Sequence, residues 1–76
     1  MEPVIITLYI KDKEHSYDLE LPADVKVKIL IQLIINALKL EGQNYTLLKD
    51  KATGEILDEN TTLGENGLWS GSILEL

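Results

Sequence analysis

The chain has 76 residues, which is the length of one domain, and we treat residues 1–76 as a single domain. It has no cysteine and only one histidine, so disulfides and a structural metal are excluded as staples, and aliphatic packing must supply the stability. Thirteen acidic against seven basic residues give a formal charge of −6, which argues against nucleic-acid binding and against adsorption to an anionic membrane.

The first two segments predict a β-hairpin. Residues 4–10 are rich in β-branched side chains and alternate between two faces, so we expect a strand. One face carries Val4, Ile6, Leu8 and Ile10, and the other carries Ile5, Thr7 and Tyr9. After a charged loop at 11–15, a second strand is predicted at 16–21. There Tyr17, Leu19 and Leu21 alternate with Asp18 and Glu20, so one side of the hairpin faces water.

Residues 25–40 predict one long helix, with Asp24 as its N-cap and Gly42 in the left-handed conformation after its end. Its polar side chains fall on one narrow stripe, formed by Lys28, Gln32, Asn36 and Lys39. The predicted core face is formed by Val27, Leu30, Ile34, Ala37 and Leu38. The apolar arc is wider than one sheet covers, with Ile29, Leu33 and Leu40 on one flank and Ile31 and Ile35 on the other.

Three further strands are predicted, at 44–49, 55–57 and 72–76. In the first of these, alternation places Tyr45 and Leu47 inward and Thr46 and Leu48 outward; in the last, Leu74 and Leu76 point inward. The order β-β-α-β-β-β indicates a two-layer α+β domain, a mixed five-stranded sheet packed on one long helix. We expect the first strand to pair in parallel with the last.

No group of residues predicts catalysis, so we expect no enzyme, no cofactor and no metal. His15 lies in a charged loop without a partner for a triad or a metal set, and we interpret it as a solvated side chain. Asp58 and Glu59 lack the spacing of a calcium loop and indicate a capped polar turn.

Two features favour a protein-binding surface. The first is the excess apolar flank of the helix, from which we select Ile29, Leu33 and Ile35; cover by the sheet and by loop 58–68 is the alternative. The second is Trp69, which follows a core leucine in a turn before the last strand. It can lie on the surface, where tryptophan is enriched as an interface anchor; packing over a neighbouring loop is the alternative.

The whole chain resembles the ubiquitin-like β-grasp superfamily. The resemblance rests on Leu21-Pro22-x-Asp24 before the helix, the core spacing of Val27, Leu30 and Ile34, Thr62-Leu63, and the closing segment 72–76. Within the superfamily it is most similar to the small bacterial YukD/EsaB proteins. This similarity rests on Tyr17-Asp18-Leu19, on residues 21–23 with Val27-Lys28, and on residues 67–71.

The resemblance implies a non-conjugated adaptor that binds protein components of type VII, WXG-type secretion in Gram-positive bacteria. The first ten residues lack a basic region, so we expect no signal peptide, a cytoplasmic location and no membrane insertion.

The predicted last strand reaches Leu76 without a Gly-Gly tail, which argues against conjugation. The alternatives are a C-terminally truncated modifier or sulfur carrier, and a domain of a larger membrane protein; a monomer or a weak homodimer through the helix flank is expected.

Overall fold

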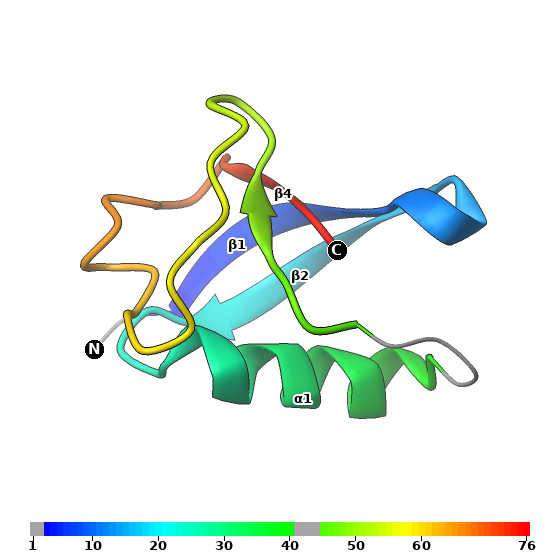
Figure 1. Cartoon of the computed structure of the whole chain (residues 1–76), viewed down its shortest axis with the longest axis horizontal. Helices are drawn as coiled ribbons and strands as arrows, with labels where there is room; N and C mark the ends of the chain where they lie inside the picture. Colours follow the sequence, from blue (N-terminus) through cyan, green and yellow to red (C-terminus); the bar gives the residue numbers. More distant parts are fainter. Residues whose placement is uncertain (1–2, 41–44) are drawn as a thin grey trace.

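The computed structural model describes residues 3–40 and 45–76 as a sheet with one helix packed on it (Figure 1). In chain order the elements are β1 (Pro3–Ile10), the short 3-10 helix η1 (Lys11–Lys13), β2 (His15–Pro22), α1 (Val27–Leu38), β3 (Lys49–Asp50) and β4 (Ile73–Glu75). The predicted α+β class and the predicted hairpin followed by a helix are confirmed.

The sheet has the strand order β2-β1-β4-β3. β1 pairs antiparallel with β2 over its whole length and parallel with β4, where Thr7 lies opposite Ile73. The parallel contact between the first and the last strand is therefore as predicted. It places β1 at the centre of the sheet and leaves β2 as an edge strand.

The prediction of five strands is wrong, because the described residues form four. Of the strand expected at 44–49, only Lys49 pairs, within the two-residue β3, and Asn44 lies outside the described residues. The strand expected at 55–57 is a single bridge between Lys49 and Ile56. Side chains bend the chain here instead: Asp50 Oδ1 accepts a hydrogen bond from the N–H of Ala52 at 3.1 Å.

The predicted orientation of two neighbouring leucines is reversed. Leu48 is fully buried, whereas the side chain of Leu47 is 58% exposed. Tyr45 is buried as expected, and Thr46 is exposed. Residues 45–48 do not form a ladder, so the two-residue period of a strand does not apply to them, and the buried side chains are three residues apart.

The helix is shorter than predicted, at 12 residues, and Asp24 is not its N-cap. Lys26 occupies that position without a side-chain hydrogen bond. The first free amides are satisfied by a distant loop instead, because Val27 N–H donates to the carbonyl of Thr61 at 2.8 Å and Lys28 N–H to that of Glu59 at 3.1 Å. Lys39 takes the left-handed conformation at the other end, and the predicted role of Gly42 falls outside the described residues.

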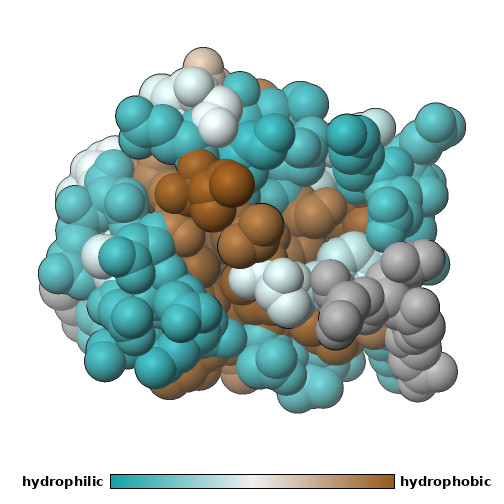
Figure 2. Space-filling model, in the orientation of Figure 1, coloured by the Kyte–Doolittle hydropathy of each residue, from teal (hydrophilic) through white to brown (hydrophobic). Residues whose placement is uncertain are grey.

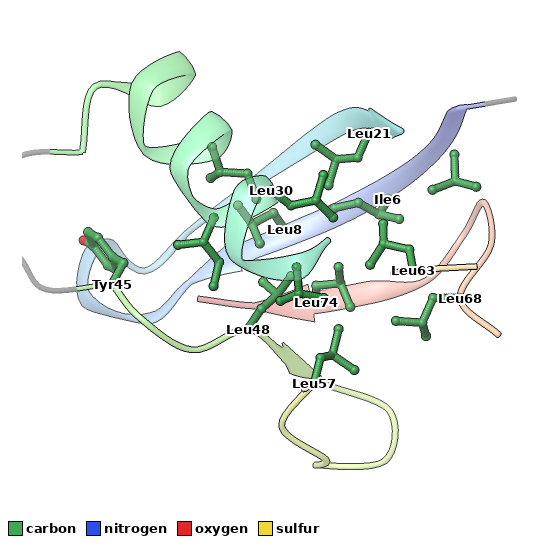
Figure 3. Packing of buried hydrophobic residues seen from close by; sticks show 14 of the residues in the cluster. Ile6, Leu8, Leu21, Leu30, Tyr45, Leu48, Leu57, Leu63, Leu68 and Leu74 are labelled. Atoms are coloured by element: carbon green, nitrogen blue, oxygen red, sulfur yellow. The ribbon is translucent and has the colours of Figure 1, made fainter. Parts of the chain in front are cut away.

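The core lies between the helix and the inner face of the sheet, and Figure 3 shows Leu8, Leu30 and Leu74 converging on it from β1, α1 and β4. The predicted inward residues of β1 and the helix residues Val27, Leu30 and Ile34 are all buried. Leu38 is half-buried, but Ala37 is exposed, contrary to the prediction, because it lies at the border of the covered arc. Burial of this aliphatic set supplies the main stabilising free energy.

Candidate functional site

One flank of α1 is exposed and the other is covered. Ile29 and Leu33 are 47% and 46% exposed and lie one helical turn apart, so they form a continuous apolar strip, which we call the helix flank. Ile35 is half-buried, and Ile31 and Leu40 are buried. The structure therefore exposes two of the three helix residues selected from the sequence and covers much of the third.

A second group of exposed apolar residues includes Trp69, which is 58% exposed. Ile5 on β1 and Ile73 on β4 are also exposed, at 57% and 45%. The register sets Thr7 opposite Ile73, so Ile5 lies diagonally across from Ile73 on the outer face of the sheet. The N–H of Ile5 donates to Ser70 Oγ at 3.1 Å, which brings the turn that carries Trp69 beside β1. We call Ile5, Trp69 and Ile73 the tryptophan face.

Hydrogen bonds and one buried leucine hold the turn before Trp69 in place. Thr62 and Glu65 form a reciprocal capping box: the N–H of Glu65 donates to Thr62 Oγ1 at 3.0 Å, and the N–H of Thr62 donates to Glu65 Oε1 at 2.9 Å. Leu63 is fully buried, and its carbonyl accepts a hydrogen bond from the N–H of Leu68. Gly67 has φ +68, a conformation that other residues rarely adopt. These hydrogen bonds hold the backbone that leads to Trp69.

A hollow of about 310 Å³ lies next to the tryptophan face, between the turn at 50–52 and residues 71–73, with Leu68 and Ile73 among its lining. A partner's apolar side chain can enter it beside Ile73. The other end of the outer sheet face is charged, since Lys51 Nζ lies 4.9 Å from the centre of the Tyr9 ring and 3.3 Å from Glu75 Oε2. The outer face therefore has one apolar end and one charged end.

A third apolar area lies where β3 and the segment after it cross the front of Figure 1. Figure 2 shows apolar surface gathered in the middle of this face, with hydrophilic surface around it. Leu47 and Ile56 are each 58% exposed and line a groove of about 410 Å³ together with Tyr45, Lys49 and Glu75. The sequence does not predict this groove, because the alternation of a strand places Leu47 inward.

Two ionisable groups of this groove are perturbed. Hydrogen bonding to Lys51 lowers the pKa of Glu75, whose carboxylate also pairs with Lys49 at 3.5 Å. Burial raises the pKa of Tyr45, and Asp12 adds to the shift in the same direction. The Tyr45 hydroxyl finds no hydrogen-bond partner among the described residues. These shifts keep Glu75 charged and Tyr45 neutral.

The polar residues considered from the sequence are structural or solvated. Asp58 Oδ1 accepts the N–H of Asn60 at 2.8 Å, which confirms the predicted capped turn. His15 is exposed and its ring stacks edge-on to Tyr17 at 4.6 Å between centroids. Residues 3–40 and 45–76 contain no cluster of acidic, histidine or cysteine side chains suited to a metal, and no helix within these ranges is long and apolar enough to cross a bilayer.

Solved structures with the same fold carry very different sequences. A Caldiarchaeum subterraneum ubiquitin is 17% identical with a TM-score of 0.74, and the match covers 96% of this chain and 89% of the ubiquitin chain. The ubiquitin-like domain of EccD5 from Mycobacterium xenopi is 15% identical with a TM-score of 0.69, covering 97% and 93%. A chain of a toluene 4-monooxygenase complex is 6% identical with a TM-score of 0.81, covering 97% and 95%. Such low identities establish the fold alone.

The sheet order, the one α-helix of the described residues and these neighbours define a ubiquitin-like β-grasp fold. A family model described as WXG100 protein secretion system (Wss), protein YukD, matches residues 4–76. The chain therefore belongs to the YukD family, and the family predicted from its sequence is confirmed. A search of curated proteins found no match.

Proposed function

We propose that the chain is a non-enzymatic, non-conjugated adaptor in the cytoplasm that binds a protein component of the WXG100 secretion machinery through the tryptophan face. The observation that carries this proposal is the exposure of Trp69 in a turn that lies beside β1, where Ile5 is also exposed, as is Ile73 on the neighbouring strand β4. Membership of a family described by a secretion system supports the setting. A large aromatic anchor beside a hollow is the arrangement typical of interface hot spots.

The helix flank is the second candidate surface, and its shape is less suited to the role. Ile29 and Leu33 form a narrow strip bordered by the polar stripe of Lys28, Gln32 and Asn36. Neither residue lines the groove at Leu47 and Ile56 or the hollow beside Ile73. The strip can extend an interface, but the hollow adjoins the tryptophan face, so we assign the anchoring role to Trp69.

The test is a matched pair of variants, Trp69→Ala and Leu33→Ala, produced in cells that carry the secretion genes. Co-purification with secretion components and export of WXG100 proteins are measured for each. We expect Trp69→Ala to weaken co-purification by about 30-fold, which corresponds to a hot spot of about 2 kcal/mol, and to reduce export. Leu33→Ala should change both much less.

Thermal melts of both variants serve as the control, because exposed side chains contribute little to stability and both proteins should remain folded. Full co-purification by a folded Trp69→Ala protein would refute the tryptophan face as the docking surface. If Leu33→Ala alone loses the partner, the helix flank takes its place. If neither variant nor the unaltered chain retains any secretion component, the adaptor proposal fails.

A further inference from the structure

β2 offers an unpaired edge of main-chain hydrogen-bonding groups. The strand order places β2 at the border of the sheet with β1 as its one neighbour among the described strands. It is eight residues long, and each of its residues pairs with one residue of β1, from Pro3 opposite Pro22 to Ile10 opposite His15. No bulge or internal proline interrupts it, so its main-chain groups stay open to pairing and only its side chains can restrict which strand is added.

The hydrogen bonds of β1 show which groups of β2 face outward. On the β4 side, Thr7 N–H donates to the carbonyl of Ser72 and the carbonyl of Tyr9 accepts the N–H of Leu76. The alternate residues of β1 must therefore bond to β2, because neighbouring residues of a strand direct these groups to opposite sides. Their β2 partners are Leu21, Leu19, Tyr17 and His15.

The intervening residues Ser16, Asp18 and Glu20 then direct their N–H and C=O groups to the open edge. Two observations agree with this assignment. Thr7 Oγ1 donates to Asp18 Oδ1 at 3.0 Å, a side-chain contact typical of the closer, non-hydrogen-bonded pairs. No backbone bond from these three residues to another part of the described chain is present. The edge thus provides three donors and three acceptors in line.

The side chains along this edge differ on its two sides. Asp18 and Glu20 are exposed on the outer face of the sheet, and a third acid, Glu14, is exposed in the turn just before β2. Tyr17 and Leu19 point toward the helix layer and are only half-buried, packed against the core. A strand added to β2 would therefore meet carboxylates on one of its faces and apolar side chains on the other.

The geometry points to β2 as a docking edge for an extended basic segment of a partner protein, in which lysine or arginine alternates with apolar residues. The partner adds a strand to the sheet by main-chain hydrogen bonds, places its cations beside Asp18 and Glu20, and its apolar side chains beside Tyr17 and Leu19. The net charge of −6 favours such a partner at longer range.

A second copy of the chain fits this edge poorly. Pairing β2 with another β2 would bring Asp18 and Glu20 of each copy against the acids of the other, and like charges facing each other across a strand pair are destabilising. The same acids explain how a long bare edge avoids self-association while remaining open to a strand of opposite charge.

The probe is a capped peptide of about seven residues in which lysine and valine alternate, added to the full chain at low salt. Binding is followed by amide NMR and by hydrogen exchange. We expect the amides of Ser16, Asp18 and Glu20 to exchange at least about tenfold more slowly in the complex, because strand addition converts exposed N–H groups into bonded ones. A peptide with glutamate in place of lysine should not bind.

Matched variants separate the edge from general attraction. Asp18→Asn with Glu20→Gln and the control Glu55→Gln with Glu59→Gln remove the same two charges, and the asparagine keeps the acceptor for Thr7. The edge pair should weaken binding by about tenfold, since each exposed charge pair contributes a factor of a few, and the control pair should weaken it much less. Trp69→Ala should bind the peptide normally, so this test is independent of the proposed tryptophan face.

Three results would overturn the proposal. The first is peptide binding that leaves the exchange of Ser16, Asp18 and Glu20 unchanged. The second is equal loss in the edge and control pairs, which would show general attraction only. The third is protection of these amides without peptide that grows with protein concentration, which would make a second copy the occupant.

Discussion

Replacing Leu47 and Leu48 separately with alanine tests the packing of the segment before β3. The two residues are adjacent and chemically identical, but Leu48 is fully buried and Leu47 is 58% exposed. Truncating a buried leucine removes about three carbon groups from the core, or about 2.4 kcal/mol of transfer free energy. A cavity term adds to this, so Leu48→Ala should lower the free energy of unfolding by about 3 kcal/mol.

Leu47 keeps about four-tenths of its surface covered, so the same truncation should cost about 1 kcal/mol at most. Urea denaturation followed by far-UV circular dichroism measures both values. With a slope of about 1 kcal/mol per molar for a small domain, the midpoints of the two variants should differ by about 2 M. In thermal melts, the Leu48→Ala transition should fall by at least about 12 °C.

A larger loss for Leu47→Ala than for Leu48→Ala would refute this account. It would mean that the segment forms a regular strand with the alternation that its sequence suggests. Equal losses of about 2 kcal/mol would mean that both side chains are half-buried and that the groove lined by Leu47 is closed.

Two further predictions concern charge and backbone conformation. Glu75→Gln should reduce stability at about pH 7, and its difference in stability from the unaltered chain should shrink toward about pH 3 in urea melts. The folded state lowers the pKa of Glu75. Its contribution to stability is therefore present above the pKa of the unfolded chain and is lost as the pH falls through the pKa of the folded state. A difference that stays constant with pH would contradict the assigned pairing with Lys51. Lys39→Gly should stabilise the chain by roughly 0.5–1 kcal/mol, because Lys39 has φ +53. Lys28→Gly, inside the helix, should instead destabilise it by about 1 kcal/mol.

The sequence predicts regular segments well because their periods are local. The alternation in β1 gives its buried face correctly, and the helical spacing of Val27, Leu30 and Ile34 gives the core face of α1. The helix end is a different case. Asp24 is a favourable capping residue, but the backbone of 59–61 supplies the acceptors, and a contact so distant in sequence leaves no local pattern.

The candidate surfaces depend on tertiary contacts even more strongly. The sequence leaves exposure and loop packing of Trp69 both open, and the structure exposes it. Alternation places Ile5 on the face of β1 away from the core, but nothing local indicates that β4 brings Ile73 diagonally across from it. Likewise, Ile29 and Ile31 both flank the predicted core face of the helix, but Ile29 is exposed and Ile31 is buried.

The central position of β1 has a consequence for synthesis. Its neighbour on one side is the last strand, and the hydrogen bond from Ile5 to Ser70 spans 65 positions. The hairpin can form as soon as β2 has left the ribosome, but the other border of β1 must wait until β4 has been made, because long-range pairing comes late in folding. During this interval a nascent chain carries an apolar strand with one bare side, and any ligand that requires the finished sheet can bind only after β4 has been added to it.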